Sequence, residues 1–480
     1  MTEIHLETRR SFSPRSGGVA WSRQTSLNNV MGWVIVAFVA LVPIPFGSGR
    51  PFFWGVNAVF VGLAGVAYAT GLYHLREPFR HSMAHFPVSA TLYFVFMLYL
   101  LVQVTPLELV PFVVNWLPNL QIHAQSGMTL APDRISLAPG ATWLMLLRWG
   151  TFGLFYFLVL QIASNERRRS LLLHSALMTI SAYGIFGLAS LLQFGDTVLG
   201  LPKWAYQGSA TATFVNRNSF ATFLAFGATL GCALFAGALV RQLPAPGEAP
   251  LRRNLDPTLL FYPVALAAIV PTLLATQSRM GTLSASVGCL VVIVTALVRM
   301  PKLWLRALML VPAVIVAGAL AFFIFGQDLL ERLGSTATSS DVRLELYKQI
   351  IAMIAARPWL GYGGGSFELV YPLFHQLPVS PDLVWERAHN SYLALWAELG
   401  VVIGSIPILL LAIVLVRILG GIGAARRSWG AQAAGLGVVT VGAVHSLVDF
   451  SLEIQANTIL LLFITAIATA GAMRNKSSAR

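Results

Sequence analysis

The chain has 480 residues, of which 56% are hydrophobic and 11% are charged, and its mean hydropathy is +0.71. About a quarter of the residues of a typical soluble domain are charged, so this composition excludes an ordinary soluble protein. The formal net charge of +13 would suggest a nucleic-acid partner in a soluble protein, but its placement along this chain argues against one.

Apolar runs of about 20 residues recur along the chain and are separated by short polar breaks. The runs are continuous rather than alternating, which favours helices over a β-barrel. The sequence therefore predicts an all-α, polytopic helical membrane protein with about 12 transmembrane helices. The predicted spans are residues 31–48, 52–73, 87–105, 142–163, 171–194, 219–240, 258–276, 282–298, 307–325, 396–416, 431–448 and 457–473.

The segments between these spans differ in charge. Those on the side of the N-terminus carry most of the 32 Lys and Arg residues, as in the run Arg167, Arg168 and Arg169. By the positive-inside rule, both termini are cytoplasmic, and anionic lipid headgroups are the expected partners of the basic charge. Residues 1–30 are expected to form a disordered cytoplasmic tail rather than a cleaved signal, and residues 474–480 a second tail.

The predicted organisation places spans one to nine in residues 31–325 and spans ten to twelve in residues 396–473, with a long loop on the outer side, 326–395, between them. The stretch "SSDVRLELYKQIIAMIAARPWLG" in this loop predicts a helix that has Ser340 or Asp341 as its N-cap and ends near Arg357. Its expected apolar face is formed by Leu344, Tyr347, Ile351 and Ile354.

Two arginines stand at predicted helix starts on the periplasmic side. Arg217 lies in "FVNRNSF" just before span six, and Arg279 lies in "ATQSRMGT" between spans seven and eight. A guanidinium pairs bidentately with phosphate oxygens and stays charged, so two of them could clamp a lipid-linked diphosphate. The alternative is that each arginine only reaches ordinary headgroups. The neutral polar neighbours favour the clamp, and they are Asn216, Asn218, Gln277 and Ser278.

Two histidines lie near the same predicted face. His389, in "RAHNSYLALW", is suited to proton transfer near neutral pH, or it is a hydrogen-bonded interfacial histidine. In "VHSLVDFSLEIQ", His445 and Asp449 are four residues apart, which favours a structural polar patch at a helix end. Arg148 and Glu453 are further charged residues at or beyond this face.

The glycine-rich stretch "GYGGGS", 361–366, lacks the Lys and Ser or Thr of a phosphate-binding P-loop, so a turn is favoured over an anion site. Cys232 and Cys289 both lie inside apolar runs and are interpreted as small buried hydrophobes. The spacing of the sequence suggests no metal ligands and no disulfide framework.

The order of these motifs resembles the O-antigen ligase and O-antigen polymerase superfamily. The stretches that carry the resemblance are "ATATFVNRNSFA", "SR", "GYGGGSF", "AHNSYLALWAELG" and "HSLVDF", strongest over residues 205–455. The resemblance implies a bacterial inner-membrane glycosyltransferase that uses a polyprenyl-diphosphate-linked glycan donor at the periplasmic face, without a metal or cofactor. The acceptor would be lipid A-core or a growing O-antigen, capsule or exopolysaccharide chain, and other polysaccharide assembly proteins are conceivable partners.

The resemblance also assigns roles to individual residues. Arg217 and Arg279 match the diphosphate-binding arginines of the family, and His389 matches the histidine of the loop-to-helix segment, as a base or as a group that orients the acceptor. Arg343 matches an arginine at the start of the loop helix, and Asn390 follows the histidine as an expected substrate-binding residue.

Several alternatives stay open from the sequence. The motifs do not separate a ligase from a polymerase, and a protein glycosyltransferase is disfavoured because no added soluble domain is present. The alternative from another class is a polysaccharide or lipid-linked glycan transporter or flippase. The position of the long loop breaks the two-half symmetry of many transporters, which argues against that alternative.

Overall fold

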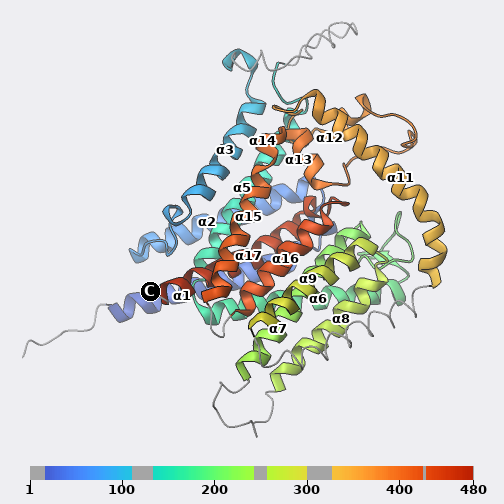
Figure 1. Ribbon diagram of the computed structural model, residues 1–480. Helices are drawn as coiled ribbons and strands as arrows, with labels where there is room; N and C mark the ends of the chain where they lie inside the picture. The colour runs from blue at the N-terminus through green and yellow to red at the C-terminus, as the bar shows by residue number, and fades with distance from the viewer. Residues whose placement is uncertain (1–16, 111–132, 243–256, 300–326, 425–428, 479–480) are drawn as a thin grey trace, which may run out of the picture.

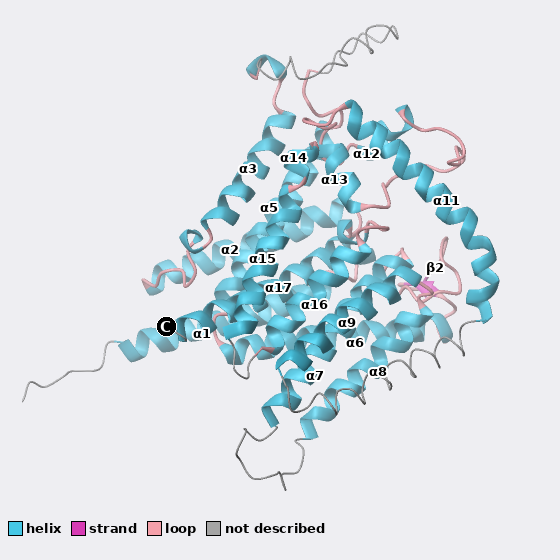
Figure 2. Ribbon diagram, in the orientation of Figure 1, coloured by secondary structure: helices cyan, strands magenta, loops and turns pink. Residues whose placement is uncertain are grey.

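The computed structural model describes residues 17–110, 133–242, 257–299, 327–424 and 429–478. For residues 17–23, 327–341 and the edges of some segments it describes the backbone alone. Helices are the main secondary structure of the described residues, and two short strands form one hairpin (Figures 1 and 2). The prediction of an all-α polytopic membrane protein is confirmed.

Within the described residues, ten helical segments are long and apolar enough to cross a membrane. The segments are Gln24–Leu41 of α1, Pro51–Leu75 (α2), Pro87–Val104 (α3), Pro139–Ile162 (α5), Glu166–Leu192 (α6), Arg217–Arg241 of α7, Pro257–Ala275 with α8, Arg279–Arg299 (α9), Val401–Gly423 with α14 and α15, and Gln455–Met473 of α17. The predicted ninth span, 307–325, lies outside the described residues.

Three predicted boundaries differ from the structure. Helix α1 covers Gly17–Leu41, so it begins inside the segment expected to be a disordered tail and ends before Pro43, which lacks a backbone N–H. The predicted tenth span starts too early, because Gly400, with φ 76°, separates α13 (Ser391–Leu399) from the membrane segment. The predicted eleventh span is the 16-residue helix α16 (Gly430–His445), which is shorter than a typical span.

Local sequence signals explain where the helices begin. Pro51, Pro87 and Pro139 each stand in the first turn of a helix, where a missing backbone N–H costs nothing. Asn165 starts α6 by accepting hydrogen bonds from the backbone N–H groups of Arg167 and Arg168. These signals are local, so they could be recognised without the tertiary structure.

Helices α7 (Arg217–Gln242) and α17 (Gln455–Ser478) form the centre of the bundle, with 72% and 83% of the residues in their most apolar stretches buried. Helices α7, α9 and α16 meet around Thr229. A Cβ at Gly288 would lie 2.9 Å from Thr229 Oγ1, and a Cβ at Gly437 would lie 2.3 Å from Thr229 Cγ2. Small residues therefore let these backbones approach closely, as is common in membrane bundles.

Three further helices cover one end of the bundle. They are α11 (Gln327–Ala356), α12 (Phe367–Val370) and α13, and Figure 1 shows α11 arching along one edge. The 3₁₀ turns are Phe46–Ser48, Met83–His85, Leu107–Leu109, Pro257–Leu260, Tyr371–Leu373 and Ser451–Glu453. The hairpin consists of β1 (Thr197–Val198) and β2 (Leu201–Pro202). Helices α14 (Val401–Gly404) and α15 (Ile406–Ala424) lie in one candidate span, and α8 (Phe261–Ala275) packs against α6 and α7.

Helix α11 corrects two predictions. It starts at Gln327, so neither Ser340 nor Asp341 is its N-cap, although it ends before Arg357 as expected. Its buried face is only partly the predicted one, because Leu344 and Ile351 are more than half exposed, whereas Ile354 is buried and Tyr347 packs against the same cluster. The buried residues are Leu346, Ile350, Met353 and Ile354, which pack with the loop residues Tyr362, Phe367, Tyr371 and Ala397. This helix is apolar on more than one side, and its packing partners decide which side is covered.

Candidate functional site

The first element of the site is the start of α7. The side chain of Asn216 accepts hydrogen bonds from the backbone N–H groups of Asn218 (2.7 Å) and Ser219 (3.4 Å). Asn216 is therefore the N-cap, and Arg217 is the first residue of the helix. This places the guanidinium beside the positive end of the helix dipole, where an anion is favoured.

The start of α9 repeats this arrangement. The buried hydroxyl of Ser278 accepts a hydrogen bond from the backbone N–H of Gly281 at 3.2 Å, which makes Ser278 the N-cap and Arg279 the first helical residue. The turn before it is tight, with Gln277 at φ 54°. The second predicted arginine thus also stands at a positive helix end.

The two helix starts lie side by side. A Cβ at Gly281 would lie 2.4 Å from the Cβ of Ala221, one turn after Arg217. The loops that precede the helices are joined as well, since Ala210 N–H donates to Ala275 O (2.8 Å) and Gln277 Nε2 donates to Gly208 O (3.0 Å). The structure therefore brings the two positive helix ends, which begin with Arg217 and Arg279, close together on the bundle.

A short hairpin holds one wall of this place. The ammonium of Lys203 forms an ion pair with Asp196 and donates to Ser209 O, and the second oxygen of Asp196 accepts from Gly208 N–H. The Lys203 side chain is only 2% exposed, so this pair fixes the loop firmly. The loop then presents Tyr206 toward α7.

Tyr206 and Ser209 contact the first arginine directly. The guanidinium carbon of Arg217 lies 5.5 Å from the ring centroid of Tyr206, within the range of a cation–π interaction. Arg217 Nη1 donates to Ser209 Oγ at 3.3 Å, and Asn216 Nδ2 donates to Tyr206 Oη at 3.3 Å. The sequence analysis did not identify Tyr206, because it lies in a loop that no periodic pattern marks.

His389 and Arg343 line a smaller cavity of about 680 Å³ that Tyr206 also borders. The imidazole ring packs between Trp385 and Phe450, with centroid distances of 5.8 and 5.1 Å. The predicted residues His389 and Arg343 thus lie beside the wall that carries Arg217.

Burial lowers the pKa of His389 below its usual value, the nearby carboxylate of Asp449 opposes this, and Arg343 adds to the decrease. The ring is therefore neutral over a wider pH range than an exposed histidine. Its Nδ1 atom is buried without a hydrogen-bond partner, which leaves it able to accept a proton.

Asp449 connects this histidine to α7. It is 1% exposed, and its carboxylate accepts hydrogen bonds from Asn218 Nδ2 (3.0 Å) and from Ser451 Oγ. His445, also 1% exposed, is hydrogen-bonded to Thr222 on α7. The sequence interpretation of a structural patch fits His445, but it missed that Asp449 borders the site.

A larger cavity of about 1280 Å³ lies between α2, α3, α5, α15 and α17. It shares lining residues with the smaller cavity, namely Tyr206, Glu386, Arg387 and Phe450. Its walls are mostly apolar and aromatic, and they extend from Arg50 at the start of α2 to Arg417 near the opposite end of α15. This shape suits a long apolar chain.

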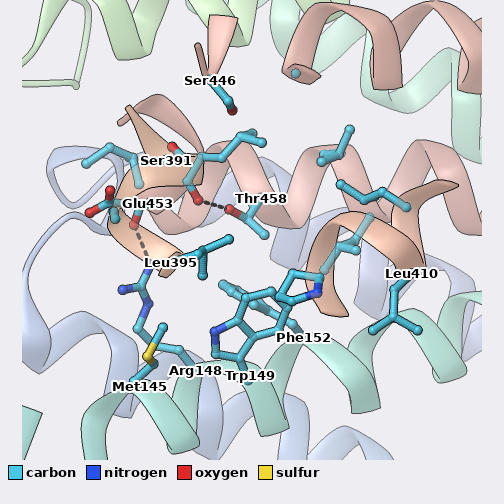
Figure 3. A pocket seen from close by; sticks show the side chains of 18 of the residues that line it. Met145, Arg148, Trp149, Phe152, Ser391, Leu395, Leu410, Ser446, Glu453 and Thr458 are labelled. Carbon is cyan, nitrogen blue, oxygen red and sulfur yellow. Dashed lines mark hydrogen bonds between the residues drawn. The ribbon is translucent and has the colours of Figure 1, made fainter. Parts of the chain in front are cut away.

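Charged side chains gather at one end of the larger cavity. Arg148 reaches from α5 to the backbone oxygen of Glu453 at 2.5 Å, as Figure 3 shows, and its guanidinium lies over the Trp54 ring at 4.3 Å. Arg387 forms an ion pair with the Glu453 carboxylate at 2.7 Å. Burial raises the pKa of nearby Glu398 to about 7, against the opposing effect of the Gly365 and Phe367 backbone N–H groups.

Three of the predicted substrate-binding residues are helix N-caps. Asn390 caps α13 by accepting from the backbone N–H groups of Tyr392 and Leu393, and its Nδ2 donates to Leu447 O. Asn216 and Ser278 cap α7 and α9. These caps explain why polar residues stand at these positions, and substrate contact by them stays a prediction.

The glycine-rich stretch is a turn, as the sequence favoured. The N–H groups of Gly363 and Gly364 are already bonded, to Glu398 O (2.9 Å) and to Gln103 Oε1 (3.0 Å). Gly363 has φ 108°, and a Cβ there would lie 2.2 Å from Ser136 Oγ, so only glycine fits. The described residues contain no group of three or more His, Cys, Asp and Glu side chains placed to hold a metal ion.

Comparison with known proteins gives one family. A comparison with curated proteins returned no match. Residues 264–408 match the family model described as O-antigen ligase, and this range contains most of α8, all of α9, and the residues Arg279, Arg343 and His389. Arg217 precedes the matched range. This match supports the assignment of the chain to the O-antigen ligase and polymerase superfamily.

Proposed function

We propose that the protein is an integral-membrane glycosyltransferase that takes a glycan from a polyprenyl-diphosphate carrier and joins it to an acceptor sugar hydroxyl. The acceptor belongs to lipid A-core or to a growing O-antigen, capsule or exopolysaccharide chain. The reaction takes place at the periplasmic face of the bacterial inner membrane and needs no metal ion. The family match supports membrane glycan transfer in general, and the site geometry supports the finer statement.

The observation that carries this proposal is the convergence of two arginine-headed helix starts. Arg217 and Arg279 each begin a helix, and the close approach of Gly281 to Ala221 sets these starts together. A diphosphate offers several anionic oxygens, which two guanidiniums and two helix ends would bind.

The same groups suit the chemistry of the transfer. The acceptor oxygen attacks the anomeric carbon, the bond from that carbon to the diphosphate oxygen breaks, and the diphosphate leaves with the electron pair. Negative charge on the leaving group grows in the transition state, so arginines aimed at it accelerate the reaction rather than only binding the donor. Removing one donor of this kind typically costs about 10²–10³ in rate.

His389 is the group suited to receive the proton of the acceptor hydroxyl. Its lowered pKa keeps it neutral near pH 7, and its Nδ1 atom is buried without a partner. General-base assistance contributes about 10²–10⁴ in rate. A role in orienting the acceptor is equally compatible with this position.

The two cavities suggest where the substrates would lie. The larger, mostly apolar cavity would hold the lipid chain of a substrate, while the smaller one, with His389 and Arg343, would hold sugar. Trp385 in the smaller cavity offers a face on which a sugar ring can stack. The shared residues Tyr206 and Arg387 would then mark the point of transfer.

The test is glycan transfer by the purified full-length chain in lipid nanodiscs, with a polyprenyl-diphosphate oligosaccharide as donor and a sugar acceptor. We expect product with and without a metal chelator, and a loss of about 10²–10³ in rate for R217A and for R279A. R241A is the matched control, because Arg241 lies on the same helix as Arg217 but at its other end, where it is exposed.

The outcomes separate the candidate functions. A single finished glycan moved to lipid A-core identifies a ligase, whereas chains that lengthen by repeat units identify a polymerase. Normal transfer by folded R217A and R279A would contradict the diphosphate clamp. Donor movement into sealed vesicles without any new linkage would contradict transfer itself and favour a flippase.

A further inference from the structure

A second group of arginines lies on the membrane face opposite the candidate site, where α5 turns into α6. Arg80 Nη1 donates to Ser164 Oγ (3.2 Å), and Arg169 Nη1 donates to Ser164 O (3.3 Å). Arg168 Nε donates to Ile162 O at 2.9 Å. The three guanidiniums therefore surround one short turn, and we refer to Arg80, Arg168 and Arg169 as the arginine cluster.

Within the arginine cluster, Arg168 is buried and has a side-chain N–H group without a hydrogen-bond acceptor. The residue is 7% exposed, and its Nη1 atom donates to Asn29 Oδ1 on α1 at 3.1 Å. Its Nη2 atom is buried and has no hydrogen-bond partner, and both oxygens that Arg168 does reach are neutral. A buried cationic donor without an acceptor is strongly unfavourable, so this atom points to an acceptor from outside the chain.

The helix dipole adds an independent reason. Arg168 and Arg169 stand in the first turn of α6, next to the positive end of that helix, where cations are disfavoured and anions are favoured. The carbonyls of Ile162 and Ala163 at the end of α5 hold the two side chains in place. Carbonyls carry only partial negative charge, so the two oxygens that Arg168 reaches do not neutralise its guanidinium.

The surroundings indicate the kind of anion. The cluster lies at the ends of candidate membrane-spanning helices, and Leu171 on the same helix is exposed on the bundle surface. Basic pockets between helices at the cytoplasmic surface bind anionic headgroups, and a guanidinium presents a planar fork to phosphate oxygens.

We propose that the arginine cluster binds the phosphate of an anionic phospholipid headgroup, such as that of phosphatidylglycerol, with Arg168 Nη2 as the donor completed by the lipid. The bound headgroup links α1, the turn between α5 and α6, and the segment after α2, because Arg168 reaches Asn29 and Arg80 reaches Gln24. The lipid therefore braces the cytoplasmic ends of helices far apart in sequence. The site is separate from the glycan-transfer site and does not depend on the proposed reaction.

The test is lipid binding by the purified full-length protein in detergent. Native mass spectrometry counts retained lipids, and the thermal unfolding midpoint is followed during titration with phosphatidylglycerol or phosphatidylcholine. We expect one phosphatidylglycerol to be retained and to raise the unfolding midpoint, with phosphatidylcholine much weaker. R168Q should bind phosphatidylglycerol about tenfold more weakly. R167Q is the matched control, since Arg167 is the exposed neighbour, and it should bind as the unchanged protein does.

Further arms cover the remaining outcomes. R80Q is the second variant, for the case in which R168Q does not fold. It leaves the contacts between Arg168 and the α5–α6 turn in place, and it should also weaken phosphatidylglycerol binding. If R168Q binds phosphatidylglycerol as tightly as the control R167Q does, the proposed site is wrong. The same comparison applies to R80Q where R168Q does not fold. If inorganic phosphate at millimolar concentration displaces the lipid fully, the cluster is a general phosphate site and the assignment to a lipid headgroup is wrong. Because no arm measures glycan transfer, these results are independent of the proposed function.

Discussion

The side chain of Asn218 donates a 3.0 Å hydrogen bond to the carboxylate of Asp449. This bond joins the helix that begins with Arg217 to the turn beside His389. Asp449 is almost fully buried and brings an acidic side chain close to His389 and Arg343. The pair therefore links the proposed phosphate-binding and proton-accepting parts of the site in one network.

The electrostatics around His389 predict opposite pH shifts for two variants. Asp449 raises the pKa of His389 and Arg343 lowers it, on top of the decrease caused by burial. A base must be neutral, so activity should rise as pH passes upward through this pKa, and the midpoint should lie below about 6.5. D449N should move the midpoint to lower pH, and R343Q should move it to higher pH. The measurement is the rate of glycan transfer against pH, and shifts of the same sign in both variants would contradict the role of His389.

The contact between α7 and α9 predicts a loss of function from one methyl group. G281A places a Cβ where it would lie 2.4 Å from the Cβ of Ala221, so the two helix starts must move apart. Overpacking of this kind costs about 1–3 kcal/mol, and misplacing catalytic groups by about 1 Å can cost about 10² in rate. We expect transfer to fall about 10²-fold in protein that still folds.

The control for this prediction is G62A on α2. A Cβ at Gly62 meets nothing within 4 Å, so the variant should keep its activity and stability. Similar transfer rates for G281A and G62A would show that the spacing of the two helix starts is unimportant.

Tyr206 is predicted to orient Arg217. Y206F keeps the ring over which the guanidinium lies at 5.5 Å but removes the hydroxyl bonded to Asn216. Y206A removes both, and the loss of a cation–π contact of about 0.5–2 kcal/mol corresponds to about a 2- to 30-fold change in rate. Transfer kinetics should therefore rank the unchanged protein first, Y206F second and Y206A last. Equal rates for Y206F and Y206A would exclude a role for the ring.

The ion pair between Arg387 and Glu453, at the charged end of the larger cavity, is predicted to stabilise the fold. E453Q leaves Arg387 without its charged partner, although both side chains are only partly buried, so we expect a loss of about 1–3 kcal/mol in the free energy of unfolding. The measurement is thermal or denaturant unfolding in detergent. K348Q provides the comparison, because Lys348 forms an exposed pair with Glu345 that should contribute less than about 1 kcal/mol.

Much of the architecture could be predicted from the sequence because its signals are local. A run of about 20 apolar residues must form a helix in a bilayer, since the backbone has no other way to satisfy its hydrogen bonds. The apolar runs that follow Arg217 and Arg279 predicted that both arginines lie just before a span, and each is the first residue of a helix in the structure.

Other features depend on contacts between distant segments. Leu344 and Ile351 fit an apolar helical face as well as Leu346 and Ile350 do, and only the packing of the outer loop decides which pair is buried. The predicted eleventh span, 431–448, is a helix of 16 residues that ends at His445 and continues as a turn toward Asp449.

The assembly of the site was decided by the tertiary structure alone. Tyr206 reaches Arg217 because a buried ion pair shapes its loop, and Asp449 reaches Asn218 across more than two hundred residues of sequence. The sequence determined which residues can carry charge and which stretches cross the membrane, since these properties depend on side-chain chemistry and local hydrogen bonding. The structure determined which of those residues meet, because close packing at Gly281 and its neighbours fixes distances that no periodicity along the chain contains.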